Sequence, residues 1–197
     1  MGRPSTSIHE PQWRHVEHGF GPLWAPDSRI LFLGTMASPR SRQAGFFYMH
    51  PRNRFWPMLQ ALYADPDDPA DVTGTTKDSR RAFALHHRIA LWDPIESCDI
   101  LGASDASIRN VVPSDLAGIV EGSDIGIICT TGRKSFEVFE KYQRPEFERR
   151  GIHVSLVPLP STSPAYAART PGQIIAMCAE RLGPDGMTPN PDCTIHL

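Results

Sequence analysis

Four short apolar runs, each closed by turn-forming or polar residues, restrict the fold of this chain more than any other feature. The runs span residues 29–34, 88–93, 125–131 and 153–160 and read RILFLG, RIALWD, IGIICTT and HVSLVPLP. Apolar segments of this length with turn residues at their ends are typical of strands that are buried on both faces. Because such strands need covering elements on each side, the runs predict the centre of an α/β fold.

Helical patterns separate these strands along the chain. Asn53 could cap the first pattern, and Thr170 followed by Pro171 gives the last pattern a strong start signal. Strands that alternate with helices predict a three-layer sandwich, in which a central, mainly parallel four-stranded sheet is flanked by helices. The helical patterns cover residues 53–64, 79–87, 113–121, 132–142 and 171–182.

The length of 197 residues suits a single domain with a substantial core. We expect one domain over residues 1–197, with its core at about 22–183. Residues 1–20 are expected to form an extension, and the tail at 184–197, rich in Pro and Gly, to be loose or draped over the surface. Residues 65–78 have the composition of a solvated loop.

Several classes of protein are disfavoured by the sequence. No apolar run approaches the ~18 residues of a membrane span, and the first 20 residues lack the apolar region of a secretory signal. The four cysteines form no CxxC pair, so we expect reduced thiols and neither a zinc nor an iron–sulfur site. These features predict a cytoplasmic protein without a metal, a cofactor or a membrane partner. The cysteines are Cys98, Cys129, Cys178 and Cys193.

Charge is distributed unevenly, although the formal net charge is only −2. Residues 28–64 contain five arginines and no Asp or Glu, whereas acidic residues gather in 65–74. A positive face of this kind is typical of phosphate binding. Within it, residues 45–53 (GFFYMHPRN) combine three consecutive aromatic residues with His and Arg, and Gly45 and Pro51 indicate a loop. Since aromatic faces stack on bases, this loop predicts binding of a nucleic acid with a base turned out of its helix.

The segments that follow the four predicted strands are rich in small and hydroxylated residues. They read GTMASPRS, WDPIESC, TTGRKS and LPSTSPAYA. In open parallel sheets, ligands bind beyond the carboxyl ends of the strands, so these segments should meet around one site. The arginines and aromatic residues then lie at the mouth of that site.

Four blocks of the sequence resemble the uracil-DNA glycosylase superfamily and, more closely, its hypoxanthine-DNA (deoxyinosine) glycosylase branch. The blocks cover most of residues 22–170, and the segment HPRNRFW within them is shared across the superfamily. The resemblance implies a monofunctional DNA repair enzyme that flips out a deaminated base and hydrolyses its N-glycosidic bond, leaving an abasic site. It implies no cofactor. The blocks are RILFLGTMASPRSRQAGFFYMHPRNRFW, HHRIALWDPIESCDILGASDASIRNVVPSDL, CTTGRKSFEVFEKY and LPSTSPAYA.

The resemblance also implies which residue positions the attacking water. This sequence departs from the superfamily pattern at two positions that bear on that role. Met36 stands where most relatives have an Asp or Asn that positions the attacking water, and Leu159 stands where classical uracil enzymes have a His. In the hypoxanthine branch the water is positioned by the Asn of the HPxNxFW segment, here Asn53. A simple helix cap is the other interpretation of Asn53, and both roles can hold together.

Base and DNA contacts follow from the same resemblance. Tyr48 is expected to stack on the extruded base, with Phe47 as the alternative, and Thr35 and Met36 to line the base pocket. Asp93 could accept a hydrogen bond from the N1–H of hypoxanthine, although a turn cap before Pro94 explains it equally well. The expected DNA-binding residues are Arg40, Ser41, His50, Arg52, Lys134, Ser161, Thr162 and Ser163.

Two other functions stay open at the level of sequence. A uracil-specific glycosylase on the same fold is disfavoured by Met36 and Leu159 without being excluded, and a non-catalytic DNA-binding module would need Asn53 to be a cap alone. The expected partner is DNA that contains deaminated bases, bound by a monomer in the cytoplasm, or in the nucleoid of a prokaryote. The sequence leaves open the preference among hypoxanthine, uracil and xanthine.

Overall fold

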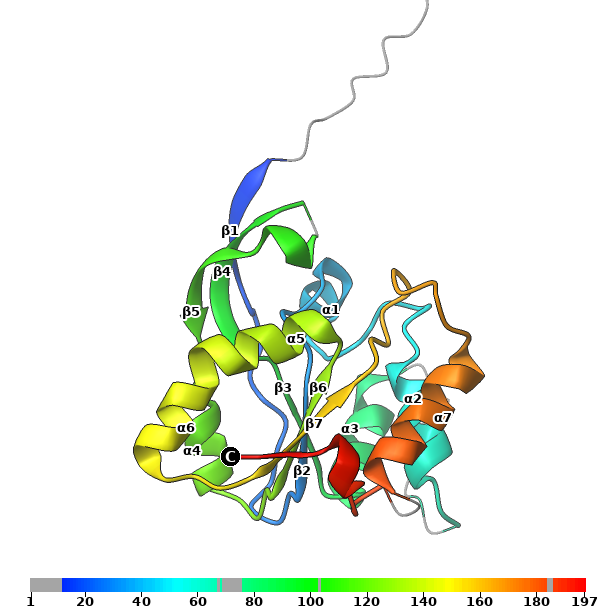
Figure 1. Cartoon of the computed structure of the whole chain (residues 1–197). Coiled ribbons are helices and arrows are strands. Elements are labelled where there is room, and N and C mark those ends of the chain that lie inside the picture. Colours follow the sequence, from blue (N-terminus) through cyan, green and yellow to red (C-terminus); the bar gives the residue numbers. More distant parts are fainter. Residues whose placement is uncertain (1–11, 67, 69–75, 103, 184–185) are drawn as a thin grey trace, which may run out of the picture.

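The structure is a computed structural model that describes residues 12–66, 68, 76–102, 104–183 and 186–197. Its centre is a five-stranded sheet in the order β3-β2-β6-β7-β8 (Figure 1). The first four of these strands are mutually parallel and coincide with the four apolar runs. They are β2 (Ile30–Leu33), β3 (Ile89–Trp92), β6 (Ile127–Thr131) and β7 (Ser155–Leu159).

The fifth strand corrects the prediction of a four-stranded sheet. β8 (Ile195–His196) lies antiparallel to β7, so the end of the tail is part of the sheet instead of loose chain. The backbone N–H of Leu197 donates to the carbonyl of Val154, and the Tyr63 hydroxyl donates to the carbonyl of Gly186 at 2.7 Å. Of the two predicted arrangements of the tail, loose or draped over the surface, the structure excludes the loose one for residues 195–197. The sequence carries no sign of β8, because its two residues have an edge to pair with only after β7 is in place.

A second sheet was not predicted from the sequence. It has three antiparallel strands in the order β1-β4-β5, namely β1 (Trp13–Glu17), β4 (Ile95–Leu101) and β5 (Arg109–Pro113). The strand β1 belongs to the segment that was expected to be an extension, and it pairs with a strand about 80 residues away in the chain, with Trp13 opposite Leu101. Side chains of β1 and β5 are mostly exposed, so neither strand carries the apolar signal that marks a buried strand.

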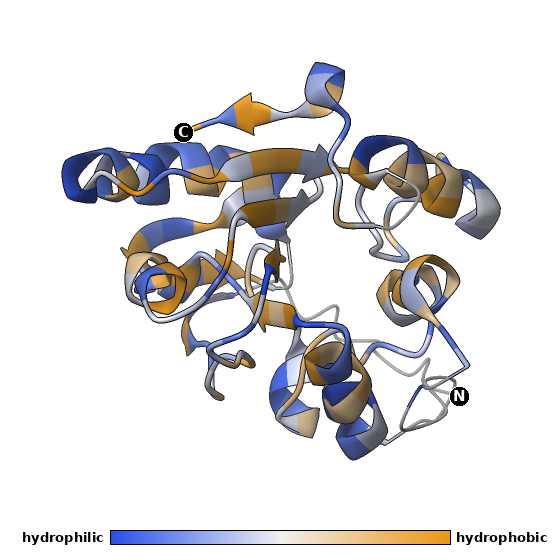
Figure 2. Ribbon diagram, turned by 90° about the horizontal axis from the view of Figure 1, so that it is seen from below, coloured by the Kyte–Doolittle hydropathy of each residue, from blue (hydrophilic) through white to orange (hydrophobic). Residues whose placement is uncertain are grey.

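Helices cover both faces of the central sheet, as expected for a three-layer sandwich. In Figure 1, α2, α3 and α7 lie on one side of the sheet, and α4, α5 and α6 lie on the other. Figure 2 shows that the strands of the central sheet are mostly hydrophobic, whereas the helices carry hydrophilic residues. The helices are α1 (Pro39–Ala44), α2 (Phe55–Tyr63), α3 (Lys77–His86), α4 (Leu116–Glu121), α5 (Arg133–Val138), α6 (Arg144–Arg150) and α7 (Pro171–Leu182).

Four of the five predicted helices differ in their bounds from the structure, and α2 and α3 do so by only one or two residues at each end. The pattern at 113–121 begins three residues later, as α4, because Asp115 caps that helix and residues up to Pro113 pair as β5. The pattern at 132–142 continues past its predicted end, since a π-helical turn, η2 (Phe139–Gln143), joins α5 to α6. By contrast, α7 has the predicted bounds and a full capping box at Thr170.

Some predictions fall partly outside the described residues. The loop expected at 65–78 includes residues 67 and 69–75, of which the structure says nothing, and residues 77–78 already belong to α3. All four cysteines are free thiols, and three of them are buried. None of the described helices has the length and apolar character that crossing a membrane requires.

Candidate active site

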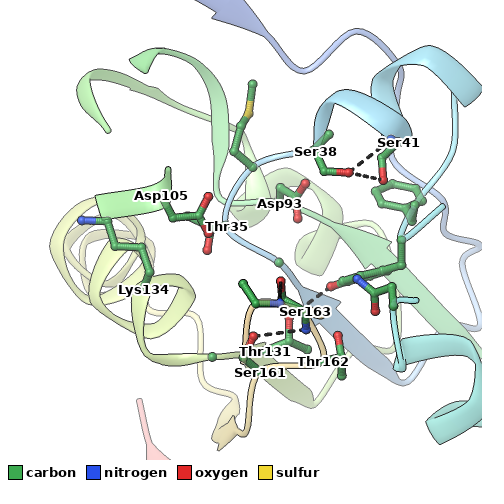
Figure 3. A pocket seen from close by; sticks show the side chains of 18 of the residues that line it. Thr35, Ser38, Ser41, Asp93, Asp105, Thr131, Lys134, Ser161, Thr162 and Ser163 are labelled. Atoms are coloured by element: carbon green, nitrogen blue, oxygen red, sulfur yellow. Dashed lines mark hydrogen bonds between the residues drawn. The ribbon is translucent and has the colours of Figure 1, made fainter. Parts of the chain in front are cut away.

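A cleft of about 690 Å³ opens at the carboxyl edge of the four parallel strands. Each strand delivers a lining residue directly after its end: Gly34 after β2, Asp93 after β3, Gly132 after β6 and Pro160 after β7. This is the edge at which the sequence placed the site, and it gathers segments that are up to about 120 residues apart. Figure 3 shows polar side chains from all these segments facing one another.

Asp93 lies in the wall of the cleft with its carboxyl group almost fully buried. Its side chain is 6% exposed, and its Oδ2 lies 2.9 Å from Nε2 of His18, a histidine with no exposed side-chain surface. The other ring nitrogen of His18, Nδ1, lies 3.0 Å from the carbonyl oxygen of Phe20. Within the described residues, we find no hydrogen-bond partner for Oδ1 of Asp93, so this oxygen is available to the cleft.

Gly34 lies against the same oxygen. A Cβ atom at Gly34 would come within 2.5 Å of Oδ1 of Asp93 and 3.3 Å of the Tyr48 hydroxyl oxygen. The turn after β2 is also fixed from behind, because the Ser135 hydroxyl lies 2.6 Å from the Gly34 carbonyl and 3.1 Å from the Leu33 carbonyl. Only glycine can therefore place the backbone this close to the carboxylate.

Tyr48 presents a ring in the cleft and is held from two sides. One face stacks on the buried ring of Phe55, with centroids 3.7 Å apart and planes 16° from parallel. The hydroxyl of Thr131 donates to the Leu33 carbonyl at 2.9 Å, so the Tyr48 hydroxyl must be the donor in its 3.2 Å contact with Thr131. Burial raises the pKa of Tyr48 far above its usual value, and nearby Asp93 adds to the rise, so the phenol stays protonated.

The backbone of Tyr48 adopts a left-handed conformation with φ of 53°, which is uncommon for a residue with a bulky side chain. Such conformations cost about 1–3 kcal/mol and persist where the surroundings hold them. Here the stack on Phe55 and the hydrogen bond to Thr131 supply that support. The loop thus fixes the orientation of one aromatic ring toward the cleft.

Asn53 faces the cleft from the residues just before α2. The N-cap position of α2 is Arg54 and not Asn53, which corrects the predicted cap. Asn53 Oδ1 still accepts a hydrogen bond at 2.9 Å from the backbone N–H of Phe55, the first helical residue. An amide oxygen has a second lone pair and the amide nitrogen has two donors, so this hydrogen bond leaves hydrogen-bonding capacity for a water or a substrate. The rigid helix start fixes the position of the side chain.

Arg54 has a structural role that the sequence did not reveal. Its guanidinium donates to the carbonyls of Thr162 at 3.3 Å, Arg169 at 2.9 Å and Tyr166 at 2.9 Å, and also to the carbonyl of Ser163. The backbone N–H of Arg54 adds a bond to Thr162 at 3.0 Å. One arginine therefore joins the segment HPRNRFW to the segment LPSTSPAYA across the cleft.

Asp105 and Lys134 form the opposite wall (Figure 3). Partial desolvation by the surrounding walls raises the pKa of Asp105, and a hydrogen bond from Thr35 and the charge of Lys134 work against that rise. Asp93 contributes to the rise as well. Lys134 is one of three cationic side chains that line the cleft. The others are Arg42, whose guanidinium donates to the Ala37 carbonyl, and Arg133, which pairs with Glu137.

No metal site is apparent in the cleft among the described residues. In the part of the chain that the structure describes, one group of carboxylates and histidines is close enough to share an ion, namely Asp65, Asp68, His86 and His87. It lies just before β3, at the opposite edge of the sheet from the cleft. His87 and Asp68 are already in contact there, with Nε2 and Oδ1 2.6 Å apart.

Comparisons with known proteins agree with this geometry. A sequence model of the "Uracil DNA glycosylase superfamily" matches residues 22–182, which is most of the chain. The chain belongs to the uracil-DNA glycosylase superfamily. The resemblance stated from the sequence is therefore confirmed at the level of the superfamily.

Individual members of the superfamily are similar over most of the chain. A "Hypoxanthine DNA glycosylase" from Methanosarcina acetivorans is 28% identical over 151 residues, which are 76% of this chain and 88% of that protein. A protein of the same name from Methanosarcina barkeri is 23% identical over 122 residues, which are 61% of this chain and 74% of that protein. A solution NMR structure of a candidate uracil DNA glycosylase from M. acetivorans superposes with a TM-score of 0.63 at 25% identity, covering 80% of this chain and 93% of that one.

The structure brings most of the predicted glycosylase residues together around the cleft. Ser41 is among them, but it is only 3% exposed. Its hydroxyl accepts hydrogen bonds from the backbone N–H of Met49 and from the Ser38 hydroxyl, so Ser41 stabilises the loop and offers little surface to a ligand. The predicted residues that line the cleft are Thr35, Met36, Ser41, Phe47, Tyr48, Asn53, Asp93, Lys134, Ser161, Thr162 and Ser163.

Three predicted DNA-binding residues of the glycosylase do not line the cleft. Arg40 lies on a shallow neighbouring depression, and Arg52 is exposed on the same loop. The ring of His50 accepts a hydrogen bond from the backbone N–H of Arg52 at 3.1 Å. Arg40 and Arg52 are next in the chain to the lining residues Ser41 and Asn53, and their contact with DNA stays a prediction.

Two residues of the glycosylase site were missed by the sequence analysis. Arg54 carries a signal that could have found it, because it belongs to the shared segment HPRNRFW. His18 carries none, since it lies before the segment that the superfamily matches and 75 residues from its partner Asp93.

Proposed function

We propose that this protein removes a deaminated base, most often hypoxanthine, from DNA by hydrolysing the N-glycosidic bond, and that it acts as a monomer in the compartment that holds the DNA. The observation that carries the proposal is that Asn53, the ring of Tyr48 and the buried carboxyl of Asp93 line the same cleft in a member of this superfamily. The naming of two similar proteins as hypoxanthine DNA glycosylases supports the choice of base.

Base flipping is the first requirement, because a base inside the duplex cannot be reached. In the proposal, the extruded base stacks on the face of Tyr48 opposite Phe55. Stacking of a base on an aromatic side chain is worth ~1–3 kcal/mol, which offsets part of the energy of unpairing. Phe47 is only 3% exposed and packs against Phe20 and Trp92, so it supports the pocket from behind.

Hydrolysis then needs a water aimed at the anomeric carbon of the sugar. Asn53 can accept a hydrogen bond from this water with the lone pair of Oδ1 that Phe55 leaves free. The bond from the sugar carbon to the base nitrogen breaks, its electron pair leaves with the base, and the water oxygen bonds to the same carbon. The water loses a proton to solvent, and the departing base takes one up.

The sugar carries positive charge as the bond breaks. Phosphates of the substrate and oriented dipoles of the cleft stabilise that charge, which is usually the largest contribution in such a site. Ser161 and Ser163 offer hydroxyl and backbone N–H groups to the phosphates, and Lys134 offers an ammonium group. Arg40 and Arg52 flank the cleft and would hold the neighbouring backbone.

Neither Met36 nor Leu159 can take the roles of the acidic and histidine side chains that the classical uracil enzymes use, and both line the cleft. A thioether cannot activate water, and an isobutyl group cannot stabilise a departing anion by hydrogen bonding. The proposal therefore places the chemistry on Asn53 and expects weak excision of uracil.

The proposal is tested by base release from duplexes that contain one deoxyinosine, deoxyuridine or deoxyxanthosine, read as alkali-labile abasic sites. Wild type, Asn53→Ala and the matched control Asn110→Ala are compared under single-turnover conditions. Asn110 is a suitable control because it lies in β5, bonded to Asp99 at 2.7 Å, and does not line the cleft.

Deoxyinosine cleavage that falls at least ~100-fold in Asn53→Ala and stays normal in Asn110→Ala supports the proposal, since loss of one catalytic hydrogen-bonding group costs ~10²–10³ in related chemistry. Cleavage of deoxyuridine alone would refute the choice of base. DNA binding without any cleavage would show a binding module on a glycosylase fold.

A further inference from the structure

His18 lies before the segment that the superfamily matches, although its partner Asp93 lies within it, and the proposed mechanism does not use His18. The histidine is brought there by the second sheet: its backbone N–H donates to the Glu96 carbonyl at 2.8 Å, which extends the pairing of β1 with β4. At the next residue, Gly19 has a φ of 86°, a left-handed conformation that turns the Phe20 carbonyl back onto the ring. The N-terminal strand thus delivers one buried histidine to the cleft.

The ring of His18 is fixed in place on every side. Its centroid lies 4.1 Å from that of Trp92 and 4.5 Å from that of Phe20, and no part of the side chain is exposed. The ring therefore cannot turn away from Asp93 or exchange its partners for water. Its two nitrogens must be satisfied by the two oxygens that they face.

Hydrogen-bond chemistry then fixes the number of protons in this pair. A carbonyl oxygen can only accept, so Nδ1 of His18 carries a proton that it donates to Phe20. Nε2 and the Asp93 oxygen Oδ2, 2.9 Å apart, need a proton between them, because two lone pairs would repel. That proton belongs either to an imidazolium beside a carboxylate or to a carboxylic acid beside a neutral ring.

Both arrangements have the same consequence for the cleft. In each of them the shared proton lies on the line between Nε2 and Oδ2, so the other oxygen of Asp93, Oδ1, carries no proton. Oδ1 is the oxygen that lies against Gly34, and we find no partner for it among the described residues. His18 thus keeps Oδ1 a hydrogen-bond acceptor.

The other charged groups around Asp93 do not determine which of its two oxygens is free of a proton. The Tyr48 hydroxyl donates to Thr131, as shown above, and burial raises its pKa so that it is neutral. Asp105 is a second carboxyl at the far wall, where Lys134 is a cation. The two arginines of the lining have other partners, because Arg42 donates to the Ala37 carbonyl and Arg133 to Glu137. Without His18, no hydrogen-bond donor would face Oδ2, so nothing would fix which oxygen of Asp93 is the acceptor toward the cleft.

We propose that His18 is a positioning residue for Asp93. It keeps Oδ1 of Asp93 a hydrogen-bond acceptor, which selects bases with the ring N–H group that deamination creates. Adenine presents a bare N1 acceptor, and its deamination to hypoxanthine places a hydrogen on N1; cytosine and uracil differ at N3 in the same way. An Oδ1 that only accepts pairs with the deaminated base and repels the lone pair of the normal one. Guanine already carries N1–H, so this contact does not exclude it.

This inference rests on the proposed function for its substrate, but its test does not depend on catalysis. Dissociation constants are measured for duplexes with a non-cleavable 2′-fluoroarabino nucleotide bearing hypoxanthine, adenine or guanine. The proteins are wild type, His18→Phe and the control His15→Phe. His15 is a matched control because it also contacts an aspartate, Asp99 at 3.0 Å, but is 59% exposed and on the outer sheet.

We expect His18→Phe to reduce the preference for hypoxanthine over adenine at least ~10-fold, the effect of one hydrogen bond won or lost, and to leave the ratio of hypoxanthine to guanine unchanged. His15→Phe should change neither ratio. A folded His18→Phe that keeps the wild-type preference, or an equal change in His15→Phe, would overturn the inference. If deoxyinosine is never cleaved but these ratios behave as expected, the proposed catalysis fails and the reading of the base stands.

A second measurement needs no folded variant. In wild-type protein labelled on histidine with ¹³C and ¹⁵N, the His18 resonance, assigned by triple-resonance methods, should report a protonated Nδ1 at neutral pH. An unprotonated Nδ1 would overturn the inference, because the number of protons assigned to the His18–Asp93 pair depends on a proton at Nδ1.

Discussion

Replacement of Arg54 by lysine tests how the segment HPRNRFW is joined to residues 162–169. The guanidinium makes four hydrogen bonds to carbonyls of residues 162–169, and it does so as a flat fork that reaches carbonyls in different directions. A lysine ammonium is a single point with three donors on a flexible stem and can keep one or two of them. Arg54→Lys therefore loses at least two hydrogen bonds while the positive charge is kept.

The size of the effect follows from that count. At about 1 kcal/mol of net stabilisation per hydrogen bond, two or three lost bonds lower the free energy of unfolding by about 2–3 kcal/mol. With a urea m-value of about 2 kcal/mol/M, the unfolding midpoint should fall by roughly 1–1.5 M. Because the segment with Ser161 and Ser163 loses its anchor, deoxyinosine cleavage should fall as well.

Equilibrium urea unfolding followed by tryptophan fluorescence measures the midpoint. Arg52→Lys is the control, because Arg52 is exposed on the same loop and surface substitutions usually change stability by less than ~0.5 kcal/mol. An Arg54→Lys protein with the midpoint of Arg52→Lys would refute the reasoning, since it would mean that the four contacts do not hold the segment in solution.

Three further predictions concern single residues. Gly34→Ala would place a methyl group 2.5 Å from Oδ1 of the buried Asp93 carboxyl, which would have to move. We expect deoxyinosine cleavage to fall at least ~100-fold in single turnover and the free energy of unfolding to fall by ~1–3 kcal/mol. Tyr48→Ala removes the stacking face and should weaken binding of a non-cleavable deoxyinosine duplex by ~1–3 kcal/mol, whereas Tyr48→Phe keeps the stack and should bind nearly as wild type. The pKa of Glu146 is lowered to about 2 by hydrogen bonds from the two arginines that end α6. Its contribution to stability is therefore present above its usual value near 4.5 and lost as pH falls toward 2, so melting curves should show a stability gap between wild type and Glu146→Gln at pH 6 that closes by pH 2.

Local sequence signals were sufficient to predict those strands and helices whose own residues specify them. The four buried strands were found from short apolar runs, and α7 was found with its bounds because Thr170, Pro171 and Gln173 specify a helix start within four residues. The position of the cleft also followed, since a parallel sheet brings all its carboxyl ends to one edge.

The second sheet could not be found in this way. Its outer strands are mostly exposed, and β1 is a strand only because β4 offers it a paired edge more than 75 residues later. The tail shows the same dependence, since β8 has two residues and pairs only with β7. Elements defined by long-range hydrogen bonds leave no periodic apolar pattern in the sequence.

The sequence by itself determined the kind of molecule: a parallel α/β sheet, a loop rich in arginine and aromatic residues at its carboxyl edge, and the segments of a DNA glycosylase. The tertiary structure alone decided which role each of several residues of the same type takes. Arg52 and Arg54 are two positions apart, yet one is exposed and the other binds carbonyls more than 100 residues away. His18 and Asp93 form a pair for the same reason, because the partner of a hydrogen bond is set by where the folded chain places it, and the residue alone does not specify that place.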